Sequence, residues 1–99
     1  MTEWRLIVEP LARADLRSVV SYYHDQAPEQ MPRFRHVVSE TMAGIRRNPH
    51  LNADVRSGYR HRATPVFPHH VWFTVDEANH TVHVLRVLHV RRDSGPLIP

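Results

Sequence analysis

The chain has 99 residues, no cysteine, 13 basic side chains, ten acidic side chains and nine histidines, which give a formal net charge of +3 at pH 7. This length is near the lower limit at which one apolar core suffices without disulfides or metals, so we expect one domain over residues 1–99. The absence of cysteine excludes a disulfide framework, a thiol nucleophile and cysteine-ligated zinc. No apolar run reaches membrane-spanning length and no signal-peptide pattern begins the chain, so we expect a soluble, cytoplasmic protein.

The first half of the chain predicts one strand and two helices. Residues 3–9 place Trp4, Leu6 and Val8 on one side and charged residues on most of the other, which indicates a short strand. Pro10 is tolerated in the first turn of a helix, and apolar residues then recur at helical spacing to about Gln26. A second helix is predicted from about Met31 to the Asn-Pro pair at 48–49. The short connection favours an antiparallel helical hairpin whose apolar face needs a sheet to cover it.

Three strands are predicted in the remainder, at residues 59–64, 67–75 and 81–90, with a turn at residues 76–79 between the last two. The order of elements is therefore β-α-α-β-β-β. We expect an α+β fold with a small, mostly antiparallel sheet and the N-terminal helical hairpin packed on one of its faces.

The last predicted strand is apolar on both faces, which is typical of a central strand. Strict alternation assigns Val82, Val84 and Leu88 to one face and Leu85 and Val87 to the other. Arg86 falls in the first of these rows, where an unpaired charge would be costly. We therefore expect Arg86 either to have a buried carboxylate partner or to lie at the rim of a site.

The distribution of charge indicates a class of partner. All the basic residues are arginines, whose planar guanidinium groups suit phosphate and carboxylate. Residues 1–32 carry a net charge of −2 and residues 33–99 a net charge of +5. This asymmetry predicts a basic surface in the C-terminal two thirds, with a polyanion or an acidic protein as its partner.

Four segments together resemble the RelE/ParE superfamily, the toxins of type II toxin–antitoxin (plasmid stabilisation) systems. They are LARADLRSVVSYYHDQAP in the first helix, the pattern of spaced apolar residues from Phe34 to Pro49, FPHHVWFTV at 67–75 and VLRVLHVRRD at 84–93. Their order and spacing cover nearly the whole chain. Membership would imply an antitoxin encoded beside the toxin and one of two activities. RelE-like members cleave messenger RNA in the ribosomal A site without a metal, whereas ParE-like members act on DNA gyrase and stall replication.

Residues for metal-free RNA cleavage would have to supply a base, an acid and cations that hold the reacting phosphate. Arg60 and Arg62 are two apart on a predicted strand and so project from one face, and the same rule places His89 and Arg91 on a common face. If the two faces coincide, these four groups would converge on one hollow. By resemblance, the basic groups of RelE-like nucleases carry over to Arg60, Arg62, His70 and Arg91, so the candidate catalytic residues are these four together with His89.

Other features resemble the ParE branch more closely. Residues 92–99 contain neither the tyrosine nor the histidine that ribonuclease branches often place after the last strand. The H-x-R-R ending at residues 89–92 and a helical hairpin rich in outward arginine are also similar to ParE. We therefore expect a toxin that inhibits DNA gyrase and is neutralised by a cognate acidic antitoxin. Messenger RNA cleavage is the first alternative, and an inactive antitoxin-binding module is the second.

The surface that meets the target or the antitoxin is expected to comprise Arg60, Arg62, His89, Arg91 and Arg92. A solvated face of an alternating strand is the other interpretation of the first two. No cofactor is expected. We also predict no metal site, because His69 and His70 point to opposite faces of their strand and no thiolate is present. The aromatic residues are interpreted as packing residues rather than base-stacking platforms; they are Tyr22, Tyr23, Trp72 and Phe73.

Overall fold

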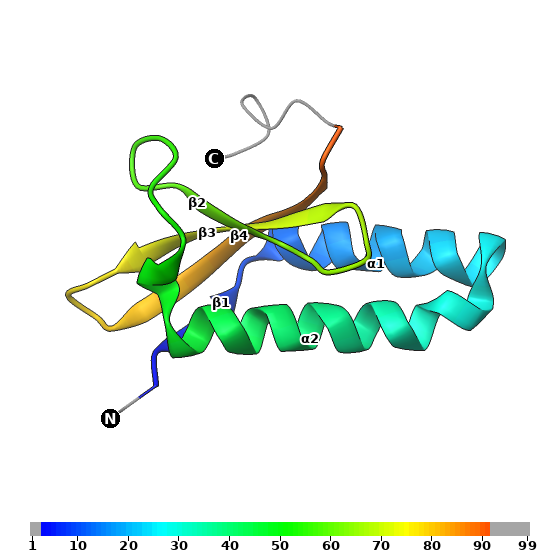
Figure 1. The fold of residues 1–99 in the computed structure, drawn as a ribbon, viewed down its shortest axis with the longest axis horizontal. Helices are drawn as coiled ribbons and strands as arrows, with labels where there is room; N and C mark the ends of the chain where they lie inside the picture. Colours follow the sequence, from blue (N-terminus) through cyan, green and yellow to red (C-terminus); the bar gives the residue numbers. More distant parts are fainter. Residues whose placement is uncertain (1–2, 92–99) are drawn as a thin grey trace.

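The computed structural model describes residues 3–91 of the chain. The elements are β1 (Arg5–Val8), α1 (Pro10–Gln26), α2 (Met31–Arg47), β2 (Arg60–Ala63), β3 (His69–Asp76) and β4 (Thr81–His89), with short 3-10 helices at Pro28–Gln30 and Pro49–Leu51. The strand order in the sheet is β1-β4-β3-β2; β1 is parallel to β4 and the other two pairs are antiparallel. The expected α+β fold with the order β-α-α-β-β-β is confirmed, and β4 is a central strand as predicted (Figure 1).

Proline fixes the ends of both long helices. Pro10 is the first residue of α1, and α2 begins at Met31 with a proline at its second position, where the missing N–H costs no helical hydrogen bond. At the far end of α2 the N–H of Asn48 still donates to the carbonyl oxygen of Gly44, and Pro49 then cannot continue the helix. The predicted helix boundaries are therefore confirmed. No helix among residues 3–91 is long and apolar enough to cross a bilayer.

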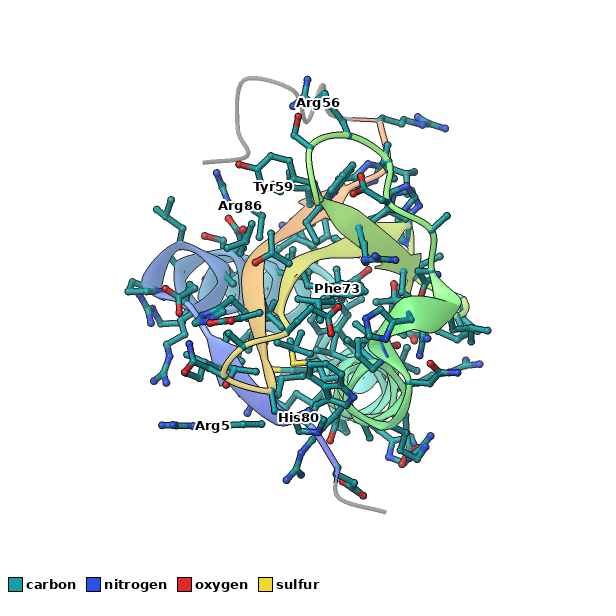
Figure 2. The ribbon with its side chains drawn as sticks, turned by 90° about the vertical axis from the view of Figure 1, so that its left-hand side faces the viewer. Arg5, Arg56, Tyr59, Phe73, His80 and Arg86 are labelled. Atoms are coloured by element: carbon teal, nitrogen blue, oxygen red, sulfur yellow. The ribbon has the colours of Figure 1, made fainter. Side chains whose placement is uncertain are left out.

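The apolar core lies between the helical hairpin and the sheet. Its largest cluster of buried residues draws on both helical and strand positions: Ala12, Ile45, Val71, Phe73, Val82, Val84 and Val87. Figure 2 shows Phe73 in the middle of the molecule, between the sheet and α2. A second cluster joins Phe34 and Val38 of α2 to Phe67, just before β3. The two clusters hold the hairpin against one face of the sheet.

A β-bulge interrupts β4. Phe73 of β3 pairs with Val84, whereas its neighbour Trp72 pairs with Arg86. Leu85 is therefore an extra residue in β4 without a partner in β3, which is the definition of a bulge.

The bulge exchanges the two faces of β4 beyond Leu85. Val87 joins Val82 and Val84 in the core under the helices, while Leu88 lies on the opposite face. The prediction that Leu88 shares a face with Val82 and Val84 was therefore wrong, because strict alternation fails wherever a strand carries one extra residue.

Among residues 3–91, no strand lies beside the outer edge of the second half of β4. β1 pairs only with residues 81–84, because it ends at Val8 and the chain turns into α1. Asp15 of α1 takes the place of a strand there, since its Oδ2 atom accepts a hydrogen bond of 2.9 Å from the N–H of Val87. The end of β4 therefore runs alongside α1.

Candidate functional site

Arg60 and Arg62 project from the face of the sheet that α2 covers. They pair with Phe73 and Val71, both core residues on that face, so the prediction that the two arginines share a face is confirmed. Both guanidinium groups are tied to the loop after α2. Arg60 Nη1 donates to the backbone oxygen of Asn52 at 2.5 Å, and Arg62 Nε donates to Asn52 Oδ1 at 2.7 Å. These hydrogen bonds hold the two cations side by side and half-buried at the β2 edge of the sheet.

Gly44 of α2 leaves room for the Arg62 guanidinium. A Cβ atom at position 44 would lie 2.5 Å from Arg62 Nη1. Burial lowers the pKa of Arg62, and the nearby guanidinium of Arg47 lowers it further. Arginine nevertheless stays charged in proteins, so this corner of the molecule concentrates positive charge.

His70 lies on the opposite face of the sheet from Arg60 and Arg62. Its ring stacks on that of His61 at a centroid distance of 4.3 Å, and the His61 ring also contacts Trp72 at 4.6 Å. Burial lowers the pKa of both histidines, and the presence of His61 lowers that of His70 further. The sheet separates His70 from the two arginines, so the three side chains cannot surround one phosphate.

His89 and Arg91 lie at the end of β4, on the far side of β3 from the arginine pair. The N–H of Arg91 donates to His89 Nδ1 at 3.1 Å, which leaves Nε2 to carry the ring proton. Two strand spacings, about 10 Å, separate the β4 backbone from that of β2. Arg92, also expected in the binding surface, lies outside the described residues. The structure therefore does not gather the candidate catalytic residues in one hollow; they are Arg60, Arg62, His70, His89 and Arg91.

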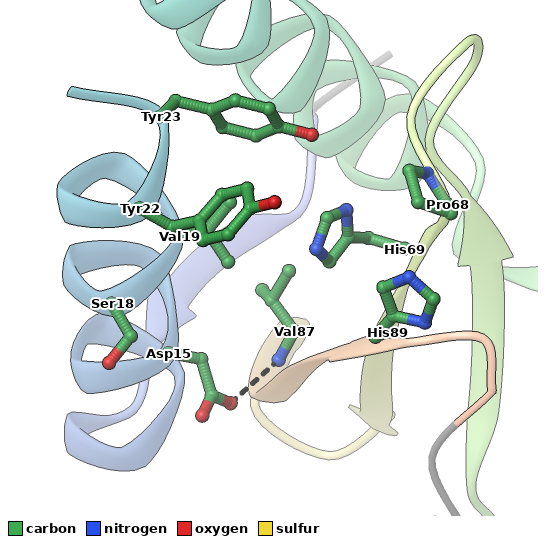
Figure 3. A pocket seen from close by; sticks show the side chains of 9 residues that line it. All are labelled: Asp15, Ser18, Val19, Tyr22, Tyr23, Pro68, His69, Val87 and His89. Atoms are coloured by element: carbon green, nitrogen blue, oxygen red, sulfur yellow. Dashed lines mark hydrogen bonds between the residues drawn. The ribbon is translucent and has the colours of Figure 1, made fainter. Parts of the chain in front are cut away.

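A cavity of about 530 Å³ lies between α1 and the end of β4. Figure 3 shows its two sides: Ser18 and Tyr22 project from α1, and Val87 and His89 from β4, with His69 of β3 between them. Tyr22 is 61% exposed, so its interpretation as a packing residue was wrong. Tyr23, Trp72 and Phe73 do pack as expected.

His69 is the buried polar group of this cavity. The residue is only 6% exposed, its ring lies 5.5 Å from those of Phe34 and His89, and its Nδ1 atom has no hydrogen-bond partner among residues 3–91. Burial lowers the pKa of His69, and His89 lowers it further. The ring is therefore neutral at pH 7, and its Nδ1 atom remains available for a hydrogen bond.

Sequence reasoning missed this cavity, although a signal was present. Asp15, Ser18 and Tyr22 stand at i, i+3 and i+7, which places them on one stripe of α1 beside its apolar face.

No group of three metal-ligating side chains was found among residues 3–91.

Comparison with protein families identifies the class of protein. The model of the ParE toxin of the type II toxin-antitoxin system, parDE, matches residues 6–94. The chain belongs to the ParE toxin family. This finding confirms the resemblance to the RelE/ParE superfamily and places the chain on its ParE side.

Two solved structures are similar in fold to this ParE-family chain. A chain of the chromosomal ParDE toxin–antitoxin system from P. aeruginosa superposes with a TM-score of 0.75 at 18% identity, covering 89% of this chain and 97% of that chain. A chain of the RelBE2 toxin–antitoxin complex from Mycobacterium tuberculosis gives a TM-score of 0.61 at 22% identity, covering 90% of this chain and 93% of that chain. Identities this low show a shared fold alone. No curated protein matches this chain.

One buried histidine, His69, and two half-buried ones, His61 and His70, predict a loss of stability in mild acid for this ParE-family chain. His61, His69 and His70 all have a pKa lowered by burial, so the unfolded state takes up protons at a higher pH than the folded state. Their contribution is fully present above the unfolded pKa of about 6.5 and is lost as the pH falls through the lowered folded values. We expect urea unfolding at pH 7.5, 6.5 and 5.5 to show a falling free energy, by up to about 1.4 kcal/mol per pH unit for each histidine.

Two single variants test which histidine is responsible. His69→Gln removes a buried titrating ring and should flatten the dependence of unfolding free energy on pH. His36→Gln removes an exposed histidine of α2 and should leave the slope unchanged. Equal slopes in the two variants would show that burial of His69 has no part in the effect.

Proposed function

We propose that this ParE-family chain inhibits DNA gyrase and is neutralised by a cognate acidic antitoxin. The observation that carries the proposal is the match to the ParE toxin family over residues 6–94. Inhibition by binding needs a complementary charged surface but no assembled catalytic group. Arg60 and Arg62 on β2, and Arg91 just after the end of β4, are charged groups of the kind that such a surface needs.

The arrangement of the candidate residues supports binding over nuclease chemistry. Metal-free RNA cleavage needs a base, an acid and cations around one phosphate. His70 lies on the opposite face of the sheet from Arg60 and Arg62. About 10 Å also separates the strand that carries His89 from the strand that carries Arg60. Each β2 arginine also uses part of its hydrogen-bonding capacity on Asn52. Messenger RNA cleavage therefore stands as the alternative.

The charge of the chain supports an acidic antitoxin as the partner. Residues 33–99 carry a net charge of +5, and guanidinium groups form strong charge-assisted hydrogen bonds with carboxylates. A partly disordered acidic segment can fold onto such a surface when it binds. The P. aeruginosa relative comes from a ParDE toxin–antitoxin system and the M. tuberculosis relative from a toxin–antitoxin complex, which supports the same class of partner here.

Purified components distinguish the two activities. We expect the protein to block supercoiling by DNA gyrase and to leave messenger RNA on ribosomes intact. The reverse result would establish the nuclease. If the protein affects neither supercoiling by gyrase nor messenger RNA on ribosomes but binds tightly to the product of the adjacent gene, it is an inactive antitoxin-binding module. In cells, expression of residues 1–99 should arrest growth, and co-expression of the adjacent gene should relieve the arrest.

A matched pair of triple variants tests the target surface in the same gyrase assay. Replacement of Arg60, Arg62 and His89 by alanine should weaken inhibition at least about tenfold, because one lost charge-assisted hydrogen bond is worth about 1.5–3 kcal/mol. The control replaces Arg33, Arg35 and His36, which are exposed on α2, and removes the same side-chain types. Circular dichroism verifies that both variants fold. Equal inhibition by the two variants would remove the β2 arginines and His89 from the target surface.

A further inference from the structure

The chain between α2 and β2 forms a protruding loop, residues 51–59. It begins at the last residue of the second short 3-10 helix and ends where β2 begins, and residues 53–58 are all exposed. Figure 1 shows this loop standing out from the sheet, and Figure 2 shows Arg56 at one end of the molecule, away from both helices. Loops held by a rigid scaffold carry a large share of binding residues in proteins.

Hydrogen bonds fix the base of the 51–59 loop. Asn52 Oδ1 accepts a hydrogen bond of 2.7 Å from Arg62 Nε, and the backbone oxygen of Asn52 accepts one from Arg60 Nη1. Both arginines stand on β2, where Arg60 pairs with Phe73 and Arg62 pairs with Val71 of the core. The two guanidinium groups therefore hold the start of the loop to the sheet.

Hydrogen bonds within the 51–59 loop also fix its tip. The N–H of Tyr59 donates to the carbonyl oxygen of Arg56 at 2.9 Å, and the N–H of Gly58 donates to Asp54 Oδ2 at 2.9 Å. Ser57 and Gly58 both have a positive φ, of 51° and 86°, as in the tight turns of β-hairpins. The tip is thus formed before a partner binds, which reduces the conformational entropy that binding would cost.

The tip presents an arginine beside exposed apolar side chains. Arg56 is exposed, and its side chain has neither a hydrogen bond nor an ion pair within residues 3–91. Val55 is 55% exposed and Leu51 is 69% exposed. Arginine is enriched among the residues that dominate binding energy at protein interfaces, and apolar area beside it adds to the gain when it is buried. The loop therefore has the composition of a binding element.

These side chains suit an acidic protein surface better than a nucleic acid. The phosphate backbone of a duplex binds guanidinium groups but offers no apolar surface to Val55 and Leu51. The carboxylate of Asp54, close to Arg56 in the chain, would also repel phosphate. A hollow in a protein can supply both a carboxylate for the arginine and apolar walls for its neighbours.

We propose that the 51–59 loop inserts into the gyrase protein, where Arg56 binds a carboxylate and Val55 and Leu51 pack against apolar side chains around it. Arg60 and Arg62 then act as positioning residues, because they hold the base of the loop. The inference rests on the proposed function, in which gyrase is the target.

Two matched pairs of variants test the loop in the gyrase supercoiling assay. Arg56→Ala should raise the half-inhibitory concentration at least about tenfold, because it removes a charge-assisted hydrogen bond. Arg35→Ala, at an exposed position of α2, should change it by less than about twofold. Val55→Ser should raise it at least about threefold through lost apolar burial. Val66→Ser, which changes a valine that is 72% exposed between β2 and β3 and has no arginine beside it, should change it by less than about twofold. Urea unfolding verifies that the four variants are folded.

Gly58→Ala tests the preformed tip. An alanine Cβ would meet no atom within 4 Å, but a φ of 86° is strained for alanine. The N–H of Tyr59 should therefore exchange with solvent at least about threefold faster, and inhibition should weaken although no side chain has been removed. Gly58→Asn should recover part of the inhibition, because asparagine tolerates a positive φ better. Full inhibition by Gly58→Ala despite faster exchange would contradict this use of the tip.

A double-variant cycle tests the positioning role of Arg62. Arg62→Ala should weaken inhibition by the unchanged protein but should add little in the Arg56→Ala background, because both changes act through the same loop. Additive losses would show that Arg62 contacts gyrase independently of the loop, contrary to this inference.

Three outcomes of these assays bear on the inference as a whole. Unchanged inhibition by Arg56→Ala and Val55→Ser would overturn it and leave the proposed function intact, and so would equal losses in the Arg35→Ala and Val66→Ser controls. Binding to duplex DNA without gyrase that falls with Arg56→Ala would also overturn it, because the loop would then bind phosphate. If the unchanged protein does not inhibit gyrase, the proposed function fails and this inference fails with it.

Discussion

Asp15→Ala is expected to lower the free energy of unfolding by about 3–5 kcal/mol, the range found when one partner of a buried ion pair is removed. The side chains of Asp15 and Arg86 are each 12% exposed. Arg86 Nε and Nη2 donate at 2.8 Å to the two carboxylate oxygens of Asp15, and these bonds raise the pKa of Arg86. Without the carboxylate, a buried guanidinium loses its partner and the N–H of Val87 loses its acceptor. Urea unfolding at pH 7.5 measures the loss.

Asp25→Ala is the matched control for Asp15→Ala. Asp25 also lies on α1, but its side chain is 68% exposed and contacts only the exposed His24 at 3.3 Å, among the described residues. The expected change is within about 0.5 kcal/mol. A double variant, Asp15→Leu with Arg86→Met, should regain much of the lost stability because it removes both buried charges. If Asp15→Ala costs no more than Asp25→Ala, the ion pair does not hold α1 against β4.

Phe34→Ala is expected to cost about 3–5 kcal/mol, as is usual when a buried phenylalanine is truncated. Phe34 is 1% exposed, and its ring lies 5.5 Å from Tyr23 of α1 and 5.3 Å from Phe67 before β3. One side chain thus links both helices to the sheet. The same ring packs against His69, so the truncation should also loosen the cavity beside α1. Urea unfolding gives the change in free energy.

Leu51→Ala provides the comparison for Phe34→Ala. Leu51 is 69% exposed, so its truncation removes little buried area and should change the free energy of unfolding by less than about 0.5 kcal/mol. Phe34→Leu should recover part of the loss, since it refills most of the space. A cost for Phe34→Ala as small as that of Leu51→Ala would mean that the second core cluster does not stabilise the fold.

The sequence by itself determined the elements, their order and the family. Prolines at positions 10 and 49 mark helix boundaries through their fixed φ angle and missing N–H, which act locally and need no tertiary contact. Apolar periodicity assigned the central position of β4 and the common face of Arg60 and Arg62, because strand alternation is also local. The cost of an unpaired buried charge predicted that Arg86 either has a carboxylate partner or lies at the rim of a site, and the structure shows that the partner is Asp15.

Only the tertiary structure decided which side chains meet. The bulge at Leu85 reverses the faces of β4 beyond it, and a single extra residue leaves little trace in the apolar pattern of a strand that is buried on both sides. The separation of His70 from the arginine pair, and the cavity that joins Tyr22 to His69, depend on the order of strands in space and on the line that α1 takes past β4. Periodicity specifies the face of an element, whereas a site forms from faces of several elements brought together by packing.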